Sequence, residues 1–342
     1  MYRTSPFLLS ILLFLMQSCG HPEDRPDLSG VVVPDIHIER FDTAFFNIDS
    51  NQVEKGLYRL NQEYPDFTVD FVSNILGAGV PGDTNRLAFE ATRQFLVSYL
   101  PIRDSLRTKY QHLDWLEKEL QLGFRYIRYY FPRYALPRGV VTYIGPLDAP
   151  GVALTSNDLA IGLQAYAGKN FSFYLTGKGQ DMYPGYVSRR FEPEYISSGC
   201  LSGLAEDIFP DSSDGRPLIE EMVIKGRYWW LAGKLQPDVP DSILTGYTQA
   251  QLAWCADHEG DIWGYFLKNT DLYTIDPDIL KNYIGEAPKT LGMPDASPGN
   301  IGAWVGWRIV KKYLDAHPNL QPVELMRTPA RTIFEGSGYK PR

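Results

Sequence analysis

Side chains that commonly hold catalytic metals are scarce in this sequence, which has only five histidines and three cysteines among 342 residues. No two histidines are three or four residues apart, so no helix can present two imidazoles on one face, as an H-E-x-x-H zinc site requires. The scarcity argues against a working zinc peptidase. Carboxylates remain plentiful, but a carboxylate-rich site suits calcium or magnesium better than zinc.

An excess of basic residues is also missing. The net charge is -8 and no run of lysine or arginine offsets it, so we expect no nucleic-acid partner. The sequence has no G-x-S-x-G motif, and "GSGYK" (336–340) is not a phosphate-binding loop because no strand precedes it and no helix follows. No repeat or Gly/Ser-rich linker divides the chain, so we expect one domain over residues 31–342.

The N-terminus carries the features of a bacterial lipoprotein. An apolar run from Phe7 to Met16 follows Arg3, has the length of a signal peptide and is too short to span a bilayer comfortably. The run stops at Ser18-Cys19, and a small residue directly before a cysteine resembles a lipobox. Residues 1–18 are therefore predicted to be a lipoprotein signal peptide, with Cys19 lipidated. The alternative is an ordinary secretory signal that happens to contain a cysteine.

Residues 19–30 are polar, contain proline and lack periodicity, which predicts a flexible tether. Each buried CH2 of a lipid chain contributes about 0.8 kcal/mol, so a multiply acylated cysteine would hold the protein on a membrane without a transmembrane helix. We expect a lipoprotein of the cell envelope, facing the periplasm or the outer membrane. Cys200 and Cys255 could pair in that compartment, but their spacing does not decide whether they do.

The order of periodicities predicts an α+β fold. Helical periodicity dominates from about residue 52 to 131 and again from about 192 to the C-terminus. Strand-like runs lie at 31–38, 139–145, 151–156 and 159–164, with turns between the last three. Alternating βαβ units are not seen. We therefore expect a mainly helical single domain with a small, partly antiparallel sheet.

One predicted helix, "RPLIEEMVIKGRYWWL" (216–231), has the shape of a zinc-peptidase motif without its histidines. Glu221 takes the place of the motif's glutamate, while Glu220 and Ile224 stand where the histidines would be. Ile224 cannot bind a metal. Spacing of 3.6 residues predicts one core-facing side, and Ile224 and Tyr228 on the other side indicate that this second side is also covered. The core-facing residues are Leu218, Ile219, Met222, Val223, Gly226, Trp229 and Trp230.

A second predicted helix carries a carboxylate within its apolar stripe. Thr248 to Gln251 has the capping-box pattern and opens "QLAWCADHEGDIWGYFL", in which Glu259 lies among apolar positions. An ion buried there without a partner costs several kcal/mol, so Glu259 should pair with an arginine or lysine or bind a cation. The second alternative would make Glu259 the remnant of the third ligand that gluzincin-type peptidases place on a later helix.

If the fold is peptidase-like, Glu221 and Glu259 should face each other across a cleft. Two such carboxylates repel, so the pKa of one should rise unless Lys225 or Arg227 replaces the missing ion. Alternatively, Glu221 and Lys225 form an ordinary exposed pair one turn apart, contributing about 0.3–0.5 kcal/mol.

Near the C-terminus, a helix is predicted to start at Ser297-Pro298 and to present Gly302 and Gly306, four residues apart. Small residues at that spacing permit close helix packing. The basic residues Arg308, Lys311 and Lys312 interrupt the run, so a membrane-spanning G-x-x-x-G helix is not expected.

Several segments, in order, make the chain resemble the gliding-motility lipoprotein GldB family. They are "IERFDTAFFNID", "GLYRLNQEYPDF", "LIEEMVIKGRYWWL", "YTQAQLAWCADHEGDIWGYFL", "SPGNIGAWVGWRIVKKYL" and "GSGYKPR". The resemblance implies an architecture similar to gluzincin-like peptidases without intact zinc ligands. It also implies a role in gliding and the linked secretion apparatus. One departure is Gln164-Ala165, where the family pattern leads us to expect an acidic residue followed by a bulky apolar one.

Two functions follow as hypotheses. The first is a non-catalytic, lipid-anchored scaffold that binds other envelope proteins of the motility or secretion machinery and needs no cofactor. The second is a metal-dependent hydrolase with an atypical carboxylate site built from Glu220, Glu221 and Glu259. We favour the first because Ile224 and the scarcity of histidine remove the usual metal ligands.

Overall fold

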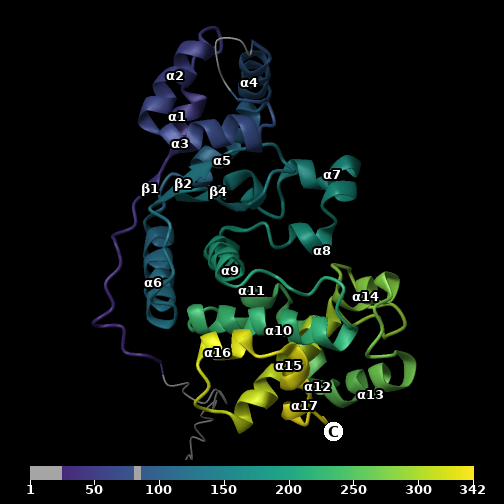
Figure 1. The fold of residues 1–342 in the computed structure, drawn as a ribbon. Helices are drawn as coiled ribbons and strands as arrows, with labels where there is room; N and C mark the ends of the chain where they lie inside the picture. The colour runs from purple at the N-terminus through teal and green to yellow at the C-terminus, as the bar shows by residue number, and fades with distance from the viewer. Residues whose placement is uncertain (1–24, 81–85) are drawn as a thin grey trace, which may run out of the picture.

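The computed structural model describes residues 25–80 and 86–342, and the predicted signal peptide and Cys19 lie outside this part. Figure 1 shows helices at both ends of the molecule and a small sheet between them. The α-helices are α1 (Phe41–Phe46), α2 (Val53–Glu63), α3 (Pro65–Asp70), α4 (Arg86–Ser98), α5 (Leu100–Lys109), α6 (Asp114–Tyr130), α7 (Gly177–Met182), α8 (Gly185–Ser188), α9 (Ile196–Ile208), α10 (Leu218–Leu235), α11 (Asp241–Thr245), α12 (Gln249–Asp257), α13 (Glu259–Asn269), α14 (Pro277–Ile284), α15 (Ile301–Ala316), α16 (Pro322–Arg327) and α17 (Ala330–Ser337).

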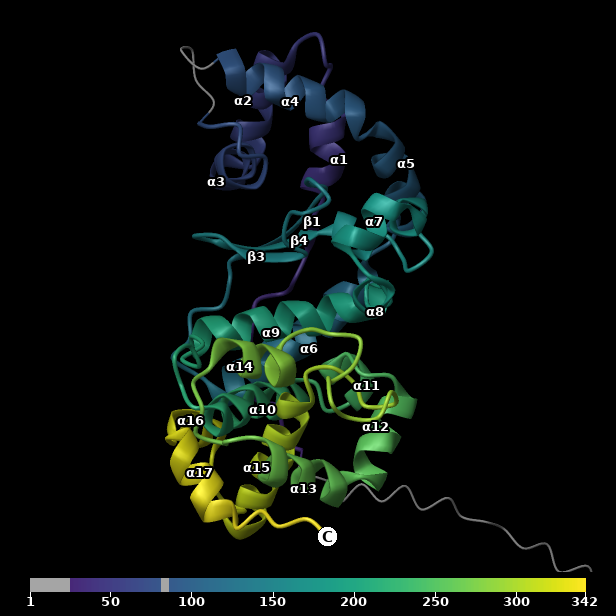
Figure 2. The same cartoon turned by 90° about the vertical axis from the view of Figure 1, so that its right-hand side faces the viewer.

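The sheet has the order β1-β2-β4-β3, formed by β1 (Ile38–Glu39), β2 (Gly139–Tyr143), β4 (Asp158–Gly162) and β3 (Val152–Leu154). β1, β2 and β4 run parallel, and β3 pairs with β4 antiparallel at the edge. The predicted α+β class with a small, partly antiparallel sheet is therefore confirmed. Helix α1 covers one face and α9 the other (Figure 2).

The predicted strands are longer in the sequence pattern than in the structure, and the differences at 31–38 and 159–164 are explained by the local structure. The pattern at 31–38 yields a strand only at Ile38–Glu39. The pattern at 159–164 ends at Gly162, because Leu163–Tyr166 closes into the 3-10 helix η2. The apolar residues before Ile38 are exposed or only partly buried, whereas Leu163 and Gln164 are fully buried, and neither segment pairs with a strand. The other single-turn elements are the π-helix η1 (Phe71–Ile75) and the 3-10 helices η3 (Ser172–Leu175) and η4 (Pro193–Tyr195).

Aromatic packing holds the N-terminal helices together. Phe41 of α1 contacts Phe67 and Phe71 edge-on, with ring centroids 4.8 and 4.9 Å apart, and all three side chains are buried. Edge-to-face contacts of this kind contribute about 0.5–1.5 kcal/mol each beyond the area that they bury. Tyr143 of β2 extends this cluster and joins it to the sheet.

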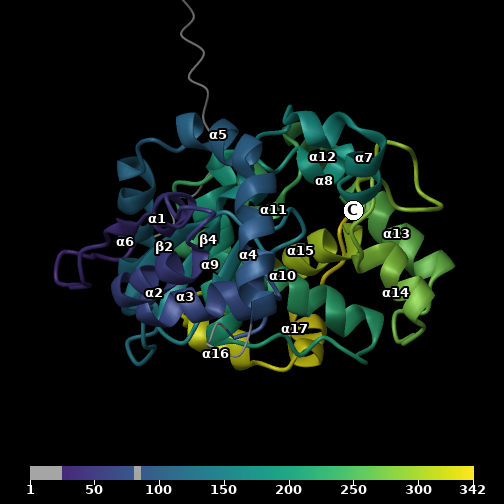
Figure 3. The same ribbon diagram turned by 90° about the horizontal axis from the view of Figure 1, so that it is seen from above.

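Helix α10 is the centre of the C-terminal half, where it lies beside α15 (Figure 3), and residues on both of its sides are covered. The side predicted to face the core does so: Met222 and Val223 are fully buried. On its other side Ile224 and Arg227 are buried too, and Arg227 donates to the carbonyls of Met326 and Thr328 at 2.9 and 2.8 Å. The loop after α16 therefore covers the surface for which the sequence suggested a cleft.

The segment predicted as one helix from 249 is divided at His258. The capping box is present, since Gln251 N–H donates to Thr248 Oγ1 and Thr248 N–H donates back to Gln251 Oε1. His258 has a non-helical backbone between α12 and α13, and its ring stacks on Trp254. The C-terminal helix likewise begins later than Ser297, because Asn300 takes a left-handed conformation immediately before α15.

The described end of the predicted tether lies on the body. Arg25 forms an ion pair with Asp238 at 2.8 Å, and Arg125 of α6 donates to the carbonyl of Leu28. Further along, the Ile36 N–H donates to Gln121. Residues 25–30 are thus attached by side chains of α6 and of the turn after α10. Among the described helices, none combines the length and the apolar character needed to cross a membrane.

Candidate functional site

The three carboxylates that the sequence singled out have different charged neighbours. Glu220 pairs with Arg216 at 3.4 Å, one turn away. Burial raises the pKa of Glu221, an effect that Lys225 opposes and that Asp211 and Asp214 reinforce. Lys225 does not close an exposed pair with Glu221, because its ammonium donates to Asp211 in the loop before α10.

Glu259 was predicted either to pair with an arginine or lysine or to bind a cation. In the structure it forms an ion pair with an arginine. Arg308 Nε of α15 and the hydroxyl of Tyr339 both donate to Glu259 Oε1, each at 2.9 Å. The partners of Glu259 lie on α15 and in the segment after α17, whereas the charged neighbours of Glu221 are Lys225 in its own helix and Asp211 and Asp214 in the loop before α10. Residues 25–80 and 86–342 contain no group of three His, Cys, Asp or Glu side chains placed to hold a metal ion. Glu220, Glu221 and Glu259 are therefore not brought into one site.

The cysteines of the body are both free thiols and both fully buried. Burial raises the pKa of Cys200 well above its usual range and that of Cys255 to about 12. A thiol in such surroundings stays protonated and is a poor nucleophile. The disulfide that the sequence left open is not formed.

Gln164, at the position where an acidic residue was expected, is fully buried and makes hydrogen bonds with both ends of its amide. The N–H of Gly145 donates to its Oε1 at 2.9 Å, and its Nε2 donates to the carbonyl of Pro150 at 3.2 Å. A glutamate at this position would place a carboxylate oxygen against the Pro150 carbonyl, and that oxygen has no proton to donate. The neutral amide is therefore matched to this chain's own core.

A cleft beside α9, hereafter the central cleft, is a site that sequence reasoning missed. Its volume is about 460 Å³, and it is lined by segments that are far apart in the sequence. Small residues of α9 form one wall of the cleft. The start of the edge strand β3 forms part of a second wall. Only the tertiary fold brings these parts together. The lining residues are Gly151, Val152, Ala165, Tyr166, Arg190, Phe191, Tyr195, Ser198, Gly199, Ser202, Trp229, Ile243, Leu244, Thr245, Gly246, Glu286 and Asn300.

The central cleft is polar at one end. Arg190 donates to both carboxylate oxygens of Glu286, at 3.1 and 3.0 Å. Asn300 lies nearby with a positive φ of 58°, and its Oδ1 is buried without a hydrogen-bond partner among the described residues. The lining set includes no histidine or cysteine. A bound polar chain could form hydrogen bonds with the serines, the tyrosines, the ion pair and the unpartnered amide oxygen that line the central cleft.

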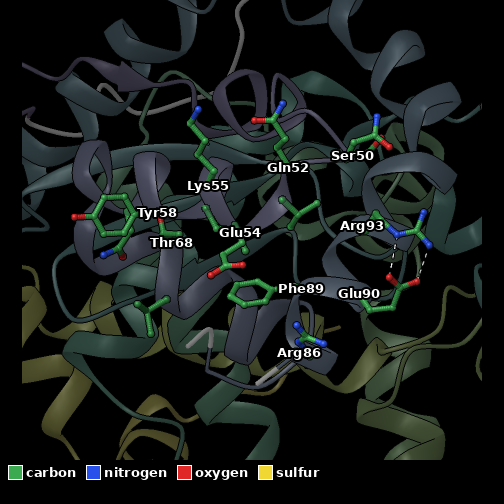
Figure 4. Close-up of a pocket in the computed structure, with 15 residues that line it drawn as sticks. Ser50, Gln52, Glu54, Lys55, Tyr58, Thr68, Arg86, Phe89, Glu90 and Arg93 are labelled. Atoms are coloured by element: carbon green, nitrogen blue, oxygen red, sulfur yellow. Dashed lines mark hydrogen bonds and ion pairs between the residues drawn. The ribbon is translucent and has the colours of Figure 1, made fainter. Parts of the chain in front are cut away.

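A larger groove of about 960 Å³ lies between α2 and α4 (Figure 4). Val53, Leu57 and Phe89 give it an apolar floor, and Glu90 and Arg93 form an ion pair at its rim. Both acidic and basic residues line the groove, so its charge favours neither an anionic nor a cationic ligand. The central cleft is therefore the stronger candidate.

Comparison with known proteins identifies the family. The model described as gliding motility protein GldB matches residues 21–341. This chain belongs to the GldB family. The match covers nearly the whole chain, so the predicted resemblance is confirmed, and membership supports involvement in gliding motility. No curated protein and no solved structure matches the chain. The likeness to gluzincin-like peptidases thus stays a prediction.

Proposed function

We propose that this protein is a lipid-anchored, non-catalytic component of the gliding-motility and associated secretion machinery of the cell envelope. The observation that carries the proposal is the family match over residues 21–341, whose model name also designates a lipoprotein. The structural partners of Glu220 and Glu259 favour a scaffold, because these side chains stabilise the fold through ion pairs. The lipidated residue would be Cys19.

The central cleft is the surface that we propose for a partner protein, bound as an extended segment. The N–H of Gly162 donates to Gly151 and that of Thr155 to Asp158, so both residues flanking β3 are bonded toward β4. Antiparallel ladders alternate, which turns the backbone groups of Val152 and Leu154 toward the free edge. An exposed edge of this kind can add a strand from another chain.

The anchor is tested by replacing Cys19 with alanine in the full chain. If lipid is the attachment, the Cys19→Ala protein should leave the membrane fraction and enter the soluble envelope fraction. Ser18→Thr, which keeps a small residue before Cys19, serves as a matched control. A Cys19→Ala protein that still partitions wholly with membranes would refute lipid as the only attachment.

The cleft is tested by filling it. Ser202→Tyr should abolish colony spreading when it replaces the native chain in a gliding host, while membrane attachment and protein level stay normal. Ser105→Tyr on the exposed side of α5 is the control, and it should spread normally. Normal spreading of the Ser202→Tyr strain would exclude the cleft as the essential surface.

The alternative function is a metal-dependent hydrolase with an atypical carboxylate site. It would require Glu220, Glu221 and Glu259 to approach one another around an ion. Metal analysis of the purified protein distinguishes the two functions, since a stoichiometric divalent ion that disappears in Glu259→Gln would favour the hydrolase.

A further inference from the structure

A basic pocket lies where three of the segments that carry the family resemblance meet. Glu259 comes from α13, Arg308 to Lys312 come from α15, and Tyr339 to Arg342 follow α17. The pocket has a volume of about 530 Å³, and five basic and two acidic side chains line it. This excess is notable in a chain whose net charge is -8. The basic residues are Arg308, Lys311, Lys312, Lys340 and Arg342, and the acidic ones are Glu259 and Asp315.

The wall of the basic pocket is built around Arg308. Its Nε donates to Glu259 Oε1, and the hydroxyl of buried Tyr339 donates to the same oxygen. The guanidinium also lies 5.9 Å from the ring centre of Trp304. Nε is the nitrogen of Arg308 that forms a hydrogen bond, and no hydrogen bond joins the terminal nitrogens to another described residue. A guanidinium oriented in this way presents two donors to the oxygens of a phosphate.

The C-terminal segment adds two further cations. Gly338, with a φ of 54°, turns the chain after α17, and the backbone of Arg342 passes so close to Gly260 that a Cβ there would lie 2.7 Å from it. This packing holds Lys340 and Arg342 at the rim, where both are exposed. Neither forms an ion pair with another described residue. Lys312, by contrast, forms an ion pair, with its Nζ 3.4 Å from Asp315 Oδ2.

The basic pocket lies at the end of the molecule where the described chain begins. In Figures 1 and 2, the first described segment of the chain starts at the same end as the C-terminal helices, opposite α1 to α4. Arg25 is attached to the body through Asp238. A chain from Cys19 to Arg25 reaches at most about 20 Å when fully extended. If Cys19 is acylated, as proposed above, this end of the body must stay close to the membrane surface.

We propose that the basic pocket binds the phosphate of an anionic phospholipid head group. The charge of the pocket, the orientation of Arg308 and the short reach from Cys19 all favour this ligand. Each lysine or arginine near an anionic bilayer strengthens attachment by about fivefold. Binding would fix the orientation of the body, with the helices α1 to α4 directed away from the membrane. This inference rests on the proposed lipid anchor.

The test uses the full acylated chain in vesicles of phosphatidylcholine, with and without phosphatidylglycerol. Amide hydrogen exchange of residues 336–342 should slow severalfold only when phosphatidylglycerol is present, and added salt should weaken the effect by screening. The triple variant Lys312→Gln, Lys340→Gln, Arg342→Gln should lose the protection. The matched triple Arg107→Gln, Lys118→Gln, Lys178→Gln removes three exposed charges elsewhere and should keep it.

The outcomes separate the pocket from the anchor. Equal exchange in both kinds of vesicle, or equal protection in the two triple variants, would overturn the proposal. A third arm adds inorganic phosphate to the phosphatidylcholine vesicles; protection there would overturn the lipid source and assign the pocket to a soluble phosphate compound. Flotation measures the anchor independently: a chain that floats with neither vesicle refutes the acyl attachment, while the phosphate arm still reports on the pocket.

Discussion

Gly226 of α10 and Gly306 of α15 lie where these two helices cross, and the two backbones are in direct contact there. A Cβ on Gly226 would lie 2.2 Å from the carbonyl carbon of Gly306, and a Cβ on Gly306 would lie 1.6 Å from the carbonyl oxygen of Met222. Both distances are far below van der Waals contact. The two longest buried helices of the C-terminal half therefore approach closely only because neither has a side chain here.

The first prediction follows from this crossing. Gly306→Ala should destabilise the protein, and Gly306→Leu should destabilise it further, by about 1–3 kcal/mol or more, because the obstacle is backbone that cannot rotate away. Chemical denaturation measures the change. Gly264→Ala in α13 is the control, since a Cβ there meets nothing within 4 Å and should stabilise by about 0.5–1 kcal/mol. An unchanged Gly306→Ala midpoint would mean that the helices do not pack this closely.

Arg227 is predicted to stabilise the fold through the carbonyls at the end of α16. Arg227→Met would keep much of the buried volume but leave the carbonyls of Met326 and Thr328 without their donor, at a cost of about 1–3 kcal/mol. Arg216→Met removes an exposed partner of Glu220 and should cost less than about 1 kcal/mol. Urea titrations of the two variants give the comparison, and equal losses would contradict the role of Arg227.

Gln164→Glu is predicted to make stability fall as the pH rises. A carboxyl group buried beside the Pro150 carbonyl should have a pKa raised above the value of about 4.3 that it has in the unfolded chain. The protonated form, which can still donate, should leave stability near the native level below about pH 4. Above that pH the carboxyl group ionises in the unfolded chain before it ionises in the folded chain. The free energy of unfolding therefore falls by up to about 1.4 kcal/mol per pH unit until the pKa of the folded state is reached.

The measurement is the free energy of unfolding of Gln164→Glu and of the native chain between pH 4 and 8. Gln62→Glu on the exposed side of α2 is the matched control and should show no such slope. A difference that stays constant with pH would mean that the substituted carboxyl group is solvated and not buried.

The thiols of Cys200 and Cys255 are predicted to be unreactive in the folded protein. Both are fully buried, and burial raises the pKa of each, so the thiolate is scarce at neutral pH. Ellman's reagent should modify neither in native conditions and both after unfolding without a reductant. Finding no free thiol in the unfolded, unreduced protein would mean that the two cysteines are paired.

Much of this protein could be predicted from local sequence patterns. The capping box at Thr248, the buried side of α10 and the glycine spacing on α15 depend on residues a few positions apart, and all three are present in the structure. The small mixed sheet was also predictable, since short apolar runs between turns favour strands. The family could be recognised for a similar reason, because each of its segments is continuous in the sequence.

The partners of charged side chains could not be predicted in this way. Glu259 required a cation, yet only the fold shows that Arg308, 49 residues later, provides it. Lys225 was a candidate to pair with Glu221, but its ammonium donates a hydrogen bond to Asp211, because the loop before α10 passes beside that turn. Such pairs depend on which segments the core brings together, and sequence distance carries no information about this.

The sequence by itself therefore determined the class of fold, the family and the lipoprotein signature at Cys19, all of which are encoded in local runs. Only the tertiary structure decided that Glu220, Glu221 and Glu259 have different charged neighbours, and that the cleft lies beside β3 and α9, with Trp229 as its lining residue on α10. It also brought α13, α15 and the C-terminal segment together around the basic pocket. The physical reason is that periodicity and capping are set by neighbours in the chain, whereas clefts and ion pairs are set by packing between distant segments.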